Sequence, residues 1–217
     1  MARRPRIASK GTCTLCKSTF DKSAMTRHLQ SCMEINQVDI DEKSTKESSS
    51  SLKFFHLLVE GHGLREYWMH LKVSGSASFR VLDSFLRKTW LECCGHMSAF
   101  SIGRSEVSMS KKLQEILRPG MKLIHEYDFG STTELLLTVI SEFEAHIEKK
   151  KVEILARNDP PEIKCSHCDN LATHICVECD YDNCWLCDDC AGDHECGEDM
   201  LLPVVNSPRT GVCGYVG

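Results

Sequence analysis

Long apolar runs are missing from this 217-residue sequence. A helix that crosses a bilayer needs about 20 predominantly apolar residues, and no such segment is present, so we expect no membrane-spanning helix. The basic start Met1-Ala2-Arg3-Arg4-Pro5-Arg6 is not followed by an apolar stretch, which also predicts the absence of a secretory signal.

Motifs of the common enzyme classes are missing as well. The chain has no glycine-rich phosphate loop, no His-Glu-x-x-His pair and no recognisable Ser-His-Asp set. Glu60, His62 and His70 lie around a predicted turn without a defined partner, and His125 and His146 stand singly. We therefore predict a protein that is not an enzyme.

Cysteine is scarce in the middle of the chain, where only Cys93 and Cys94 occur, although the whole sequence has 14 cysteines. The others cluster near the two ends. A disulfide framework does not usually leave a hundred residues almost bare, whereas clustered cysteines in a reducing compartment are typically metal ligands. We expect a cytoplasmic, metal-binding protein.

Charge is distributed unevenly behind the net value of −5. Residues 1–38 carry seven Lys/Arg against two Asp/Glu, which gives +5, and residues 158–217 carry two against 12, which gives −10. This asymmetry indicates either different partners for the two ends or attraction between them.

The chain divides into four segments. Residues 39–51 are polar and serine-rich, which predicts a flexible linker. Residues 52–157 carry the main apolar periodicity, with strands expected at 52–59, 67–73, 123–129 and 135–140 and helices at 79–90 and 110–117. These elements alternate without a regular βαβ repeat. We predict an α+β fold with a central mixed sheet, flanked by small zinc modules at 1–38 and 158–217.

The first module contains Cys13-x2-Cys16-x11-His28-x3-Cys32. A Cys-x2-Cys turn presents two thiolates to one ion, and a helix places His28 and Cys32 on one face. The spacing resembles a ββα zinc finger with Cys in place of the last His. Basic residues around it are possible nucleic-acid contacts: Arg3, Arg4, Arg6, Lys10, Lys17, Lys22 and Arg27.

Two motifs of the middle segment carry a family resemblance. The stretch from Trp90 through His96 to Phe100, followed by Tyr127-Asp128-Phe129-Gly130, resembles the pRiA4b ORF-3-like family over about residues 52–147. The resemblance implies a compact α+β domain of a kind often found with mobile elements, and it implies no chemistry. Where the family usually has Asp and then an aromatic, this chain has Ser131-Thr132-Thr133.

We expect the aromatic residues of these motifs to be core. Cys93, Cys94 and Cys213 are also interpreted as packing residues, Asp128 as a turn residue, and the role of His96 stays open. The ending Gly211-x2-Gly214-Tyr215 is similar to that of many family members, and we hypothesise that it returns to pack on the middle domain.

The C-terminal segment offers eight further ligands in four pairs, and their order resembles that of the B-box and other cross-braced zinc modules. The resemblance implies one site of Cys165, Cys168, Cys187 and Cys190, and a second of Cys176, Cys179, His194 and Cys196. An alternative register, similar to a ZZ-type finger, uses Cys184 and leaves Cys190 spare. His167 and His174 are further possible substitutes.

These patterns predict three structural zinc ions per chain. The leading hypothesis is a zinc-binding adaptor that has a protein partner and no membrane contact and is associated with a mobile element. One alternative is nucleic-acid binding through the basic N-terminal finger. Another is an enzyme with a ubiquitin-ligase-like zinc module, which rests on analogy of fold alone.

Overall fold

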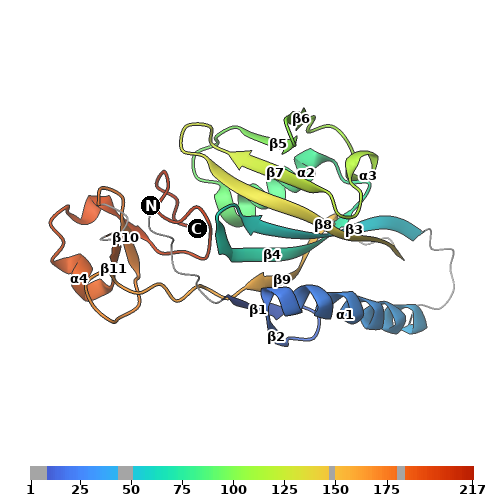
Figure 1. Ribbon diagram of the computed structural model, residues 1–217, viewed down its shortest axis with the longest axis horizontal. Helices are drawn as coiled ribbons and strands as arrows, with labels where there is room; N and C mark the ends of the chain where they lie inside the picture. Colours follow the sequence, from blue (N-terminus) through green and yellow to red (C-terminus); the bar gives the residue numbers. More distant parts are fainter. Residues whose placement is uncertain (1–8, 44–50, 147–149, 180–183) are drawn as a thin grey trace.

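A large antiparallel sheet dominates the computed structural model, which describes residues 9–43, 51–146, 150–179 and 184–217 (Figure 1). Its nine strands follow the order β2-β1-β9-β4-β3-β8-β7-β5-β6. Strands hold more of the described residues than helices do, so the predicted α+β class holds only roughly. The described pairs of the sheet are antiparallel rather than mixed, and for β3 and β4 the tight turn around Gly63 explains this, because a hairpin joins its two strands antiparallel.

The bounds of the nine strands are β1 (Lys10–Cys13), β2 (Thr19–Asp21), β3 (Ser51–Gly61), β4 (Leu64–Ser74), β5 (Ser98–Ile102), β6 (Ser105–Val107), β7 (Lys122–Tyr127), β8 (Thr133–His146) and β9 (Val152–Asn158). The helices of this part are α1 (Lys22–Lys43), α2 (Phe79–Leu86), α3 (Leu113–Ile116) and a π-helical turn, η1 (Arg87–Leu91), that continues α2. The expected helix at 79–90 is therefore split between two helix types.

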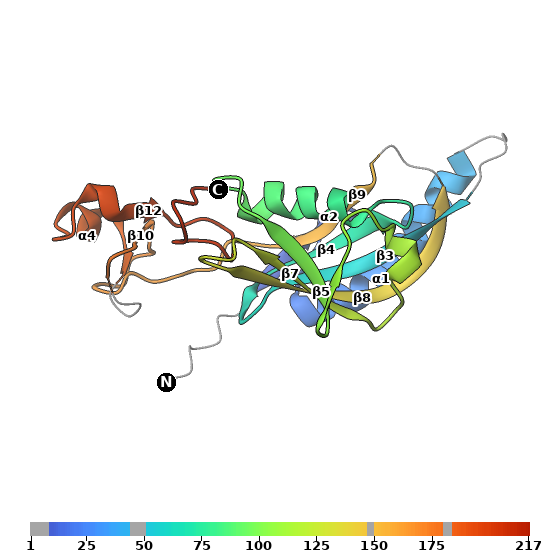
Figure 2. The same ribbon diagram turned by 90° about the horizontal axis from the view of Figure 1, so that it is seen from above.

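Helices α1 and α2 lie on opposite faces of the sheet (Figure 2). The alternation of side chains along β4 explains this, because successive residues of a strand point to opposite faces. Tyr67 and Met69 join the main core beneath α2, whereas Trp68 between them packs with Met25 and Leu29 of α1. The sheet consequently has a core on each face.

The N-terminal finger is continuous with this sheet. Strand β1 pairs with β9 as well as with β2, with Gly11 opposite Asn158 and Cys13 opposite Ala156. Of the linker predicted at 39–51, residues 39–43 continue α1 and Ser51 belongs to β3, whereas residues 44–50 lie outside the described residues.

The C-terminal module forms a separate small sheet in the order β11-β10-β12, at one end of the molecule (Figure 1). Its elements are β10 (His174–Cys176), β11 (Trp185–Leu186), β12 (Leu201–Pro203), α4 (Asp188–Gly192) and the 3-10 helix η3 (Glu198–Met200). Ile163, Ile175 and Leu186 are buried in a small apolar cluster in this module.

The tail after β12 returns to the middle of the chain. The Ser207 hydroxyl donates to the Trp90 carbonyl at 2.6 Å, and Arg157 donates to the Asn206 carbonyl. Tyr215 is buried as well. The tail therefore lies against both η1 and β9.

Candidate metal centres

The four ligands predicted in the finger meet at one point. Cys13 ends β1, Cys16 lies in the following turn, and His28 and Cys32 stand one helical turn apart on α1. Their ligand atoms all lie within 4.8 Å of one another. Cys16 Sγ is 3.2 Å from His28 Nε2, and Cys13 Sγ is 4.0 Å from Cys32 Sγ.

The eight C-terminal ligands form two interleaved groups. Cys165 and Cys168 lie with Cys187 and Cys190, while Cys176 and Cys179 lie with His194 and Cys196. The pairs therefore alternate along the chain, first with third and second with fourth. Within the first group, Cys168 Sγ is 3.6 Å from Cys187 Sγ and 3.9 Å from Cys190 Sγ.

The two registers considered from the sequence differ in whether Cys184 or Cys190 is a ligand. Cys190 belongs to the first C-terminal group, and Cys184 belongs to neither. Cys184 is buried in the small apolar cluster beside Trp185. His167 and His174 also lie outside the groups, and His174 Nδ1 instead faces the Asp188 carboxylate at 3.5 Å.

These spacings fit a tetrahedral ion. With Zn–S bonds of about 2.3 Å, two thiolates of a tetrahedron lie roughly 3.8 Å apart, and a thiolate and an imidazole slightly less. In the second C-terminal group, Cys179 Sγ is 3.7 Å from Cys196 Sγ and 3.3 Å from His194 Nε2. All 14 cysteines are free thiols.

The local backbone favours ionisation of particular thiols. Burial opposes the ionisation of Cys165, but hydrogen bonds from the backbone N–H groups of His167, Cys187 and Cys168 lower its pKa from 9.0 to about 6. The pKa of Cys16 also falls to about 6, chiefly through hydrogen bonds from Ser18. Other thiols of the groups shift the opposite way, because burial and the neighbouring thiols raise the pKa of Cys32 and of Cys179 to about 12.

A fourth group was not expected. Cys93, Cys94, His96 and Cys213 bring their ligand atoms within the same 4.8 Å limit. The interpretation as packing residues was wrong for Cys94 and Cys213, which are exposed, whereas Cys93 is partly buried and packs against the main core. The sequence Cys93-Cys94-Gly95-His96 places three possible ligands together. The fourth ligand of the group, Cys213, lies more than a hundred residues away, so spacing alone could not reveal it.

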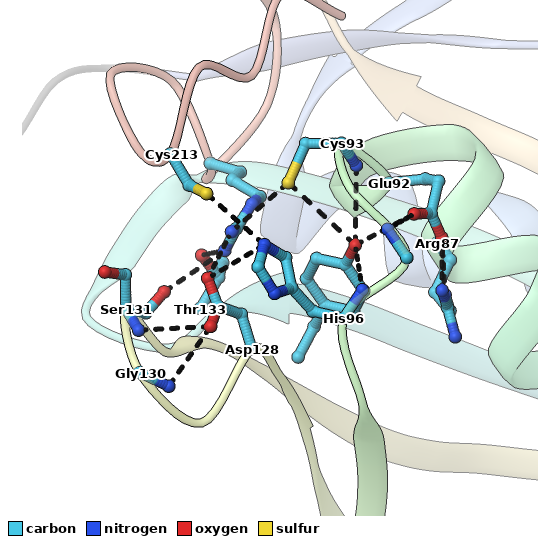
Figure 3. Close-up of polar contacts among 12 residues, drawn as sticks. Arg87, Glu92, Cys93, His96, Asp128, Gly130, Ser131, Thr133 and Cys213 are labelled. Carbon is cyan, nitrogen blue, oxygen red and sulfur yellow. Dashed lines mark hydrogen bonds and ion pairs between the residues drawn. The ribbon is translucent and has the colours of Figure 1, made fainter.

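Beside this group, a buried ion pair holds the tail to the turn after β7. Arg209 is fully buried, and its Nη2 donates to Asp128 Oδ2 at 2.7 Å while Nη1 donates to Thr133 Oγ1 at 2.9 Å. Asp128 Oδ1 accepts from the Gly130 and Ser131 amides, as the labelled residues of Figure 3 show. The hydrogen bond from Arg209 lowers the pKa of Asp128.

The remaining motif residues divide between core and surface. Trp90, Phe100 and Tyr127 are completely buried, but Phe129 is 55% exposed, so its expected place in the core was wrong. Asp128 has a positive φ of 66°, which turns the chain outward before Phe129. The Tyr127 hydroxyl instead donates to Glu92 Oε1 at 3.0 Å.

The predicted nucleic-acid contacts are placed only in part. Arg3, Arg4 and Arg6 lie outside the described residues. Lys10, Lys17 and Arg27 are exposed on the finger. Lys22 differs, because its Nζ donates to Glu60 Oε1 at 2.6 Å and to the Arg65 carbonyl, and so ties the finger to the large sheet.

Comparison with known proteins adds little to this geometry. The chain matches no family model, and no curated protein matches it. A crystal structure of a protein of unknown function, MM3350 from Methanosarcina mazei Go1, is similar with a TM-score of 0.41 and 14% identity, over 49% of this chain and 68% of that one. Among the residues that the structure describes, no helix is long and apolar enough to cross a membrane.

Proposed function

We propose that this protein is a non-enzymatic adaptor whose two ends are held in shape by structural zinc ions. The observation that carries the proposal is the completeness of the three predicted groups, each of which offers four thiol or imidazole ligands. Zinc favours such ligands in tetrahedral geometry, and four protein ligands leave no position for water or substrate. Sites of this kind stabilise a fold rather than activate a water molecule.

The placement of the groups supports binding at more than one surface. The finger lies along the large sheet, and the C-terminal module extends from the opposite end of the molecule (Figure 1). Each zinc-held unit therefore exposes its own loops, and the rigid sheet fixes the distance between them. Such an arrangement suits a protein that contacts a partner at one end while the other end stays accessible.

Charge favours a protein partner with basic residues for the C-terminal module. Ten of its carboxylates are described, and all are exposed: Asp159, Glu162, Asp169, Glu178, Asp188, Asp189, Asp193, Glu195, Glu198 and Asp199. The module's two basic residues offer little compensation, because Lys164 pairs with Asp169 and Arg209 is buried. Thiolates around zinc add further negative charge, so a phosphate backbone would be repelled.

A charge-reversal capture experiment tests this proposal. Proteins captured from a cell lysate by the full zinc-loaded chain are compared with those captured by an Asp189→Lys/Glu198→Lys variant. The matched control is Glu106→Lys/Glu115→Lys, which changes the charge equally on β6 and α3. We expect a partner that the control and the wild type both capture and the module variant loses. Equal capture of every protein by both variants would contradict the proposal.

Nucleic-acid binding through the finger is the second candidate function, favoured by the exposed side chains of Lys10, Lys17 and Arg27. Fluorescence anisotropy with a short random-sequence DNA duplex tests it. A finger that neutralises phosphates would bind with an affinity that falls steeply with salt concentration, and Arg27→Glu would weaken it. If the finger does not bind nucleic acid, the anisotropy of the duplex shows no salt-dependent binding, and the adaptor proposal alone remains.

A further inference from the structure

The fourth cysteine–histidine group joins two distant parts of the chain. Cys93, Cys94 and His96 lie in the turn between η1 and β5, while Cys213 belongs to the C-terminal tail. Figure 3 shows the side chains of Cys93, His96 and Cys213 directed toward one another. We propose that these three residues and Cys94 bind a fourth zinc ion, which fastens the tail to the central domain. This inference goes beyond the proposed adaptor function and does not depend on it.

The spacing of the ligand atoms agrees with that of the other groups. His96 Nε2 is 3.3 Å from Cys213 Sγ, compared with 3.2 Å between Cys16 and His28 and 3.3 Å between Cys179 and His194. The set of three thiols and one imidazole also matches the composition of the finger group. One chemical explanation therefore covers all four groups, with zinc as the ion that such ligands favour.

The backbone is shaped to aim these ligands. Gly95 has a φ of 76°, a conformation that glycine adopts without cost, and it reverses the chain so that His96 points back to the thiols. Cys213 itself has a φ of 52°, which is uncommon for a residue with a side chain. Its left-handed conformation places the thiol beside His96, and a metal bond would stabilise it there.

The surroundings suit a site with excess negative charge. Zinc bound by three thiolates and a neutral imidazole carries a net charge of −1. The Arg209 guanidinium lies 3.5 Å from Cys93 Sγ and provides a compensating positive charge next to the site. Asp128 Oδ2 lies 3.6 Å from the same His96 Nε2 but is already engaged by Arg209, so it holds the guanidinium beside the site rather than completing the ligand set.

The distribution of cysteines gives the proposal a matched control. Thirteen of the 14 cysteines fall into the four groups, and Cys184 alone does not. Replacing Cys184 removes a thiol that is not a ligand, whereas replacing Cys213 removes a thiol that is a ligand of the proposed fourth site. The difference between these variants isolates the fourth site from the other three.

Native mass spectrometry of the full chain, purified under reducing conditions with added zinc, tests the proposal. We expect four zinc ions in the wild type and in Cys184→Ala, and one fewer in Cys213→Ser. The decisive quantity is this difference of one ion, which does not depend on how many of the other sites are filled. Equal zinc content in wild type and Cys213→Ser would overturn the fourth site and leave the adaptor proposal standing.

Thiol alkylation of the wild-type chain gives a second test that needs no variant. Cys94 and Cys213 are exposed, so as free thiols they would react readily with iodoacetamide. We expect both to be protected in the zinc-loaded chain and to react after a chelator removes the metal. Rapid alkylation before chelation would overturn the proposal. So would a disulfide between two of these cysteines, visible as a mass two hydrogens lower that reductant restores.

Discussion

Replacing Trp68 with alanine is expected to destabilise the finger and the large sheet together. Trp68 is completely buried between α1 and the sheet, and its ring lies directly against Gly11 of β1. The indole Nε1 donates to Ser9 Oγ at 2.8 Å. A single side chain thus supports the contact between the zinc-binding strand and the central domain.

The expected cost follows from the cavity that this change creates. Truncation of a fully buried Trp to Ala typically costs about 3–5 kcal/mol, which is a large part of the roughly 5–15 kcal/mol of a whole domain. With a urea dependence of about 2 kcal/mol per molar, the midpoint of unfolding should fall by roughly 2 M. The exposed Phe129 serves as the control, because its truncation should change stability by less than about 0.5 kcal/mol.

Urea unfolding followed by two signals provides the assay. Zinc release reports on the metal groups, and the far-ultraviolet circular dichroism reports mainly on the sheet. We expect both Trp68→Ala transitions to move to lower urea by a similar amount, since β1 is part of the sheet. If zinc release moved while the sheet transition stayed in place, the finger would be an independent module and the reasoning would be refuted.

Three further predictions concern other parts of the chain. Gly11→Ala should lower the thermal midpoint, because the added Cβ would lie 2.3 Å from the Arg157 carbonyl oxygen; an unchanged midpoint in a thermal melt would contradict this packing. Cys190→Ser should cost one zinc ion by native mass spectrometry, which would be contradicted if zinc content stayed at the wild-type level. Burial lowers the pKa of His56 to about 4 and of His70 to about 3, below the usual 6.5. Both histidines are therefore neutral in the folded protein. Their burial lowers the free energy of unfolding only when the unfolded chain can bind protons, so this free energy is highest above pH 6.5 and declines as the pH falls toward 4. The slope should be roughly 1 kcal/mol per histidine per pH unit, and a flat free energy of unfolding between pH 7 and 5, with zinc in excess, would speak against it.

Local patterns of the sequence predicted which cysteines and histidines gather in three of the four groups. Cys-x2-Cys pairs and a His four residues before a Cys place their ligands by turn and helix geometry alone, so the finger set could be read directly. The two C-terminal sets needed a resemblance as well, because spacing leaves the choice between Cys184 and Cys190 open. In the structure Cys184 packs beside Trp185, and its burial explains a cysteine that spacing could not assign.

The specific partners of most long-range contacts were beyond the reach of local sequence patterns. Strand β1 can pair with β9 because Gly11 has no side chain and leaves room for the Trp68 ring. No local pattern in the sequence links residues so far apart. The same holds for Cys213, which reaches Cys93 only because Arg209 and Ser207 anchor the tail. The apolar segments of the sequence predicted where strands lie, but not which element would cover each face of the sheet.

The central claim is that metal ions, rather than apolar burial alone, hold the C-terminal module in shape. Hydrogen–deuterium exchange of the full chain before and after treatment with a chelator tests it most directly. We expect the backbone amides of β10 and β11, around Ile175 and Leu186, to lose protection when zinc is removed, while those of β3 and β4 in the main core keep theirs. Unchanged protection in β10 and β11 after complete zinc removal would contradict the claim.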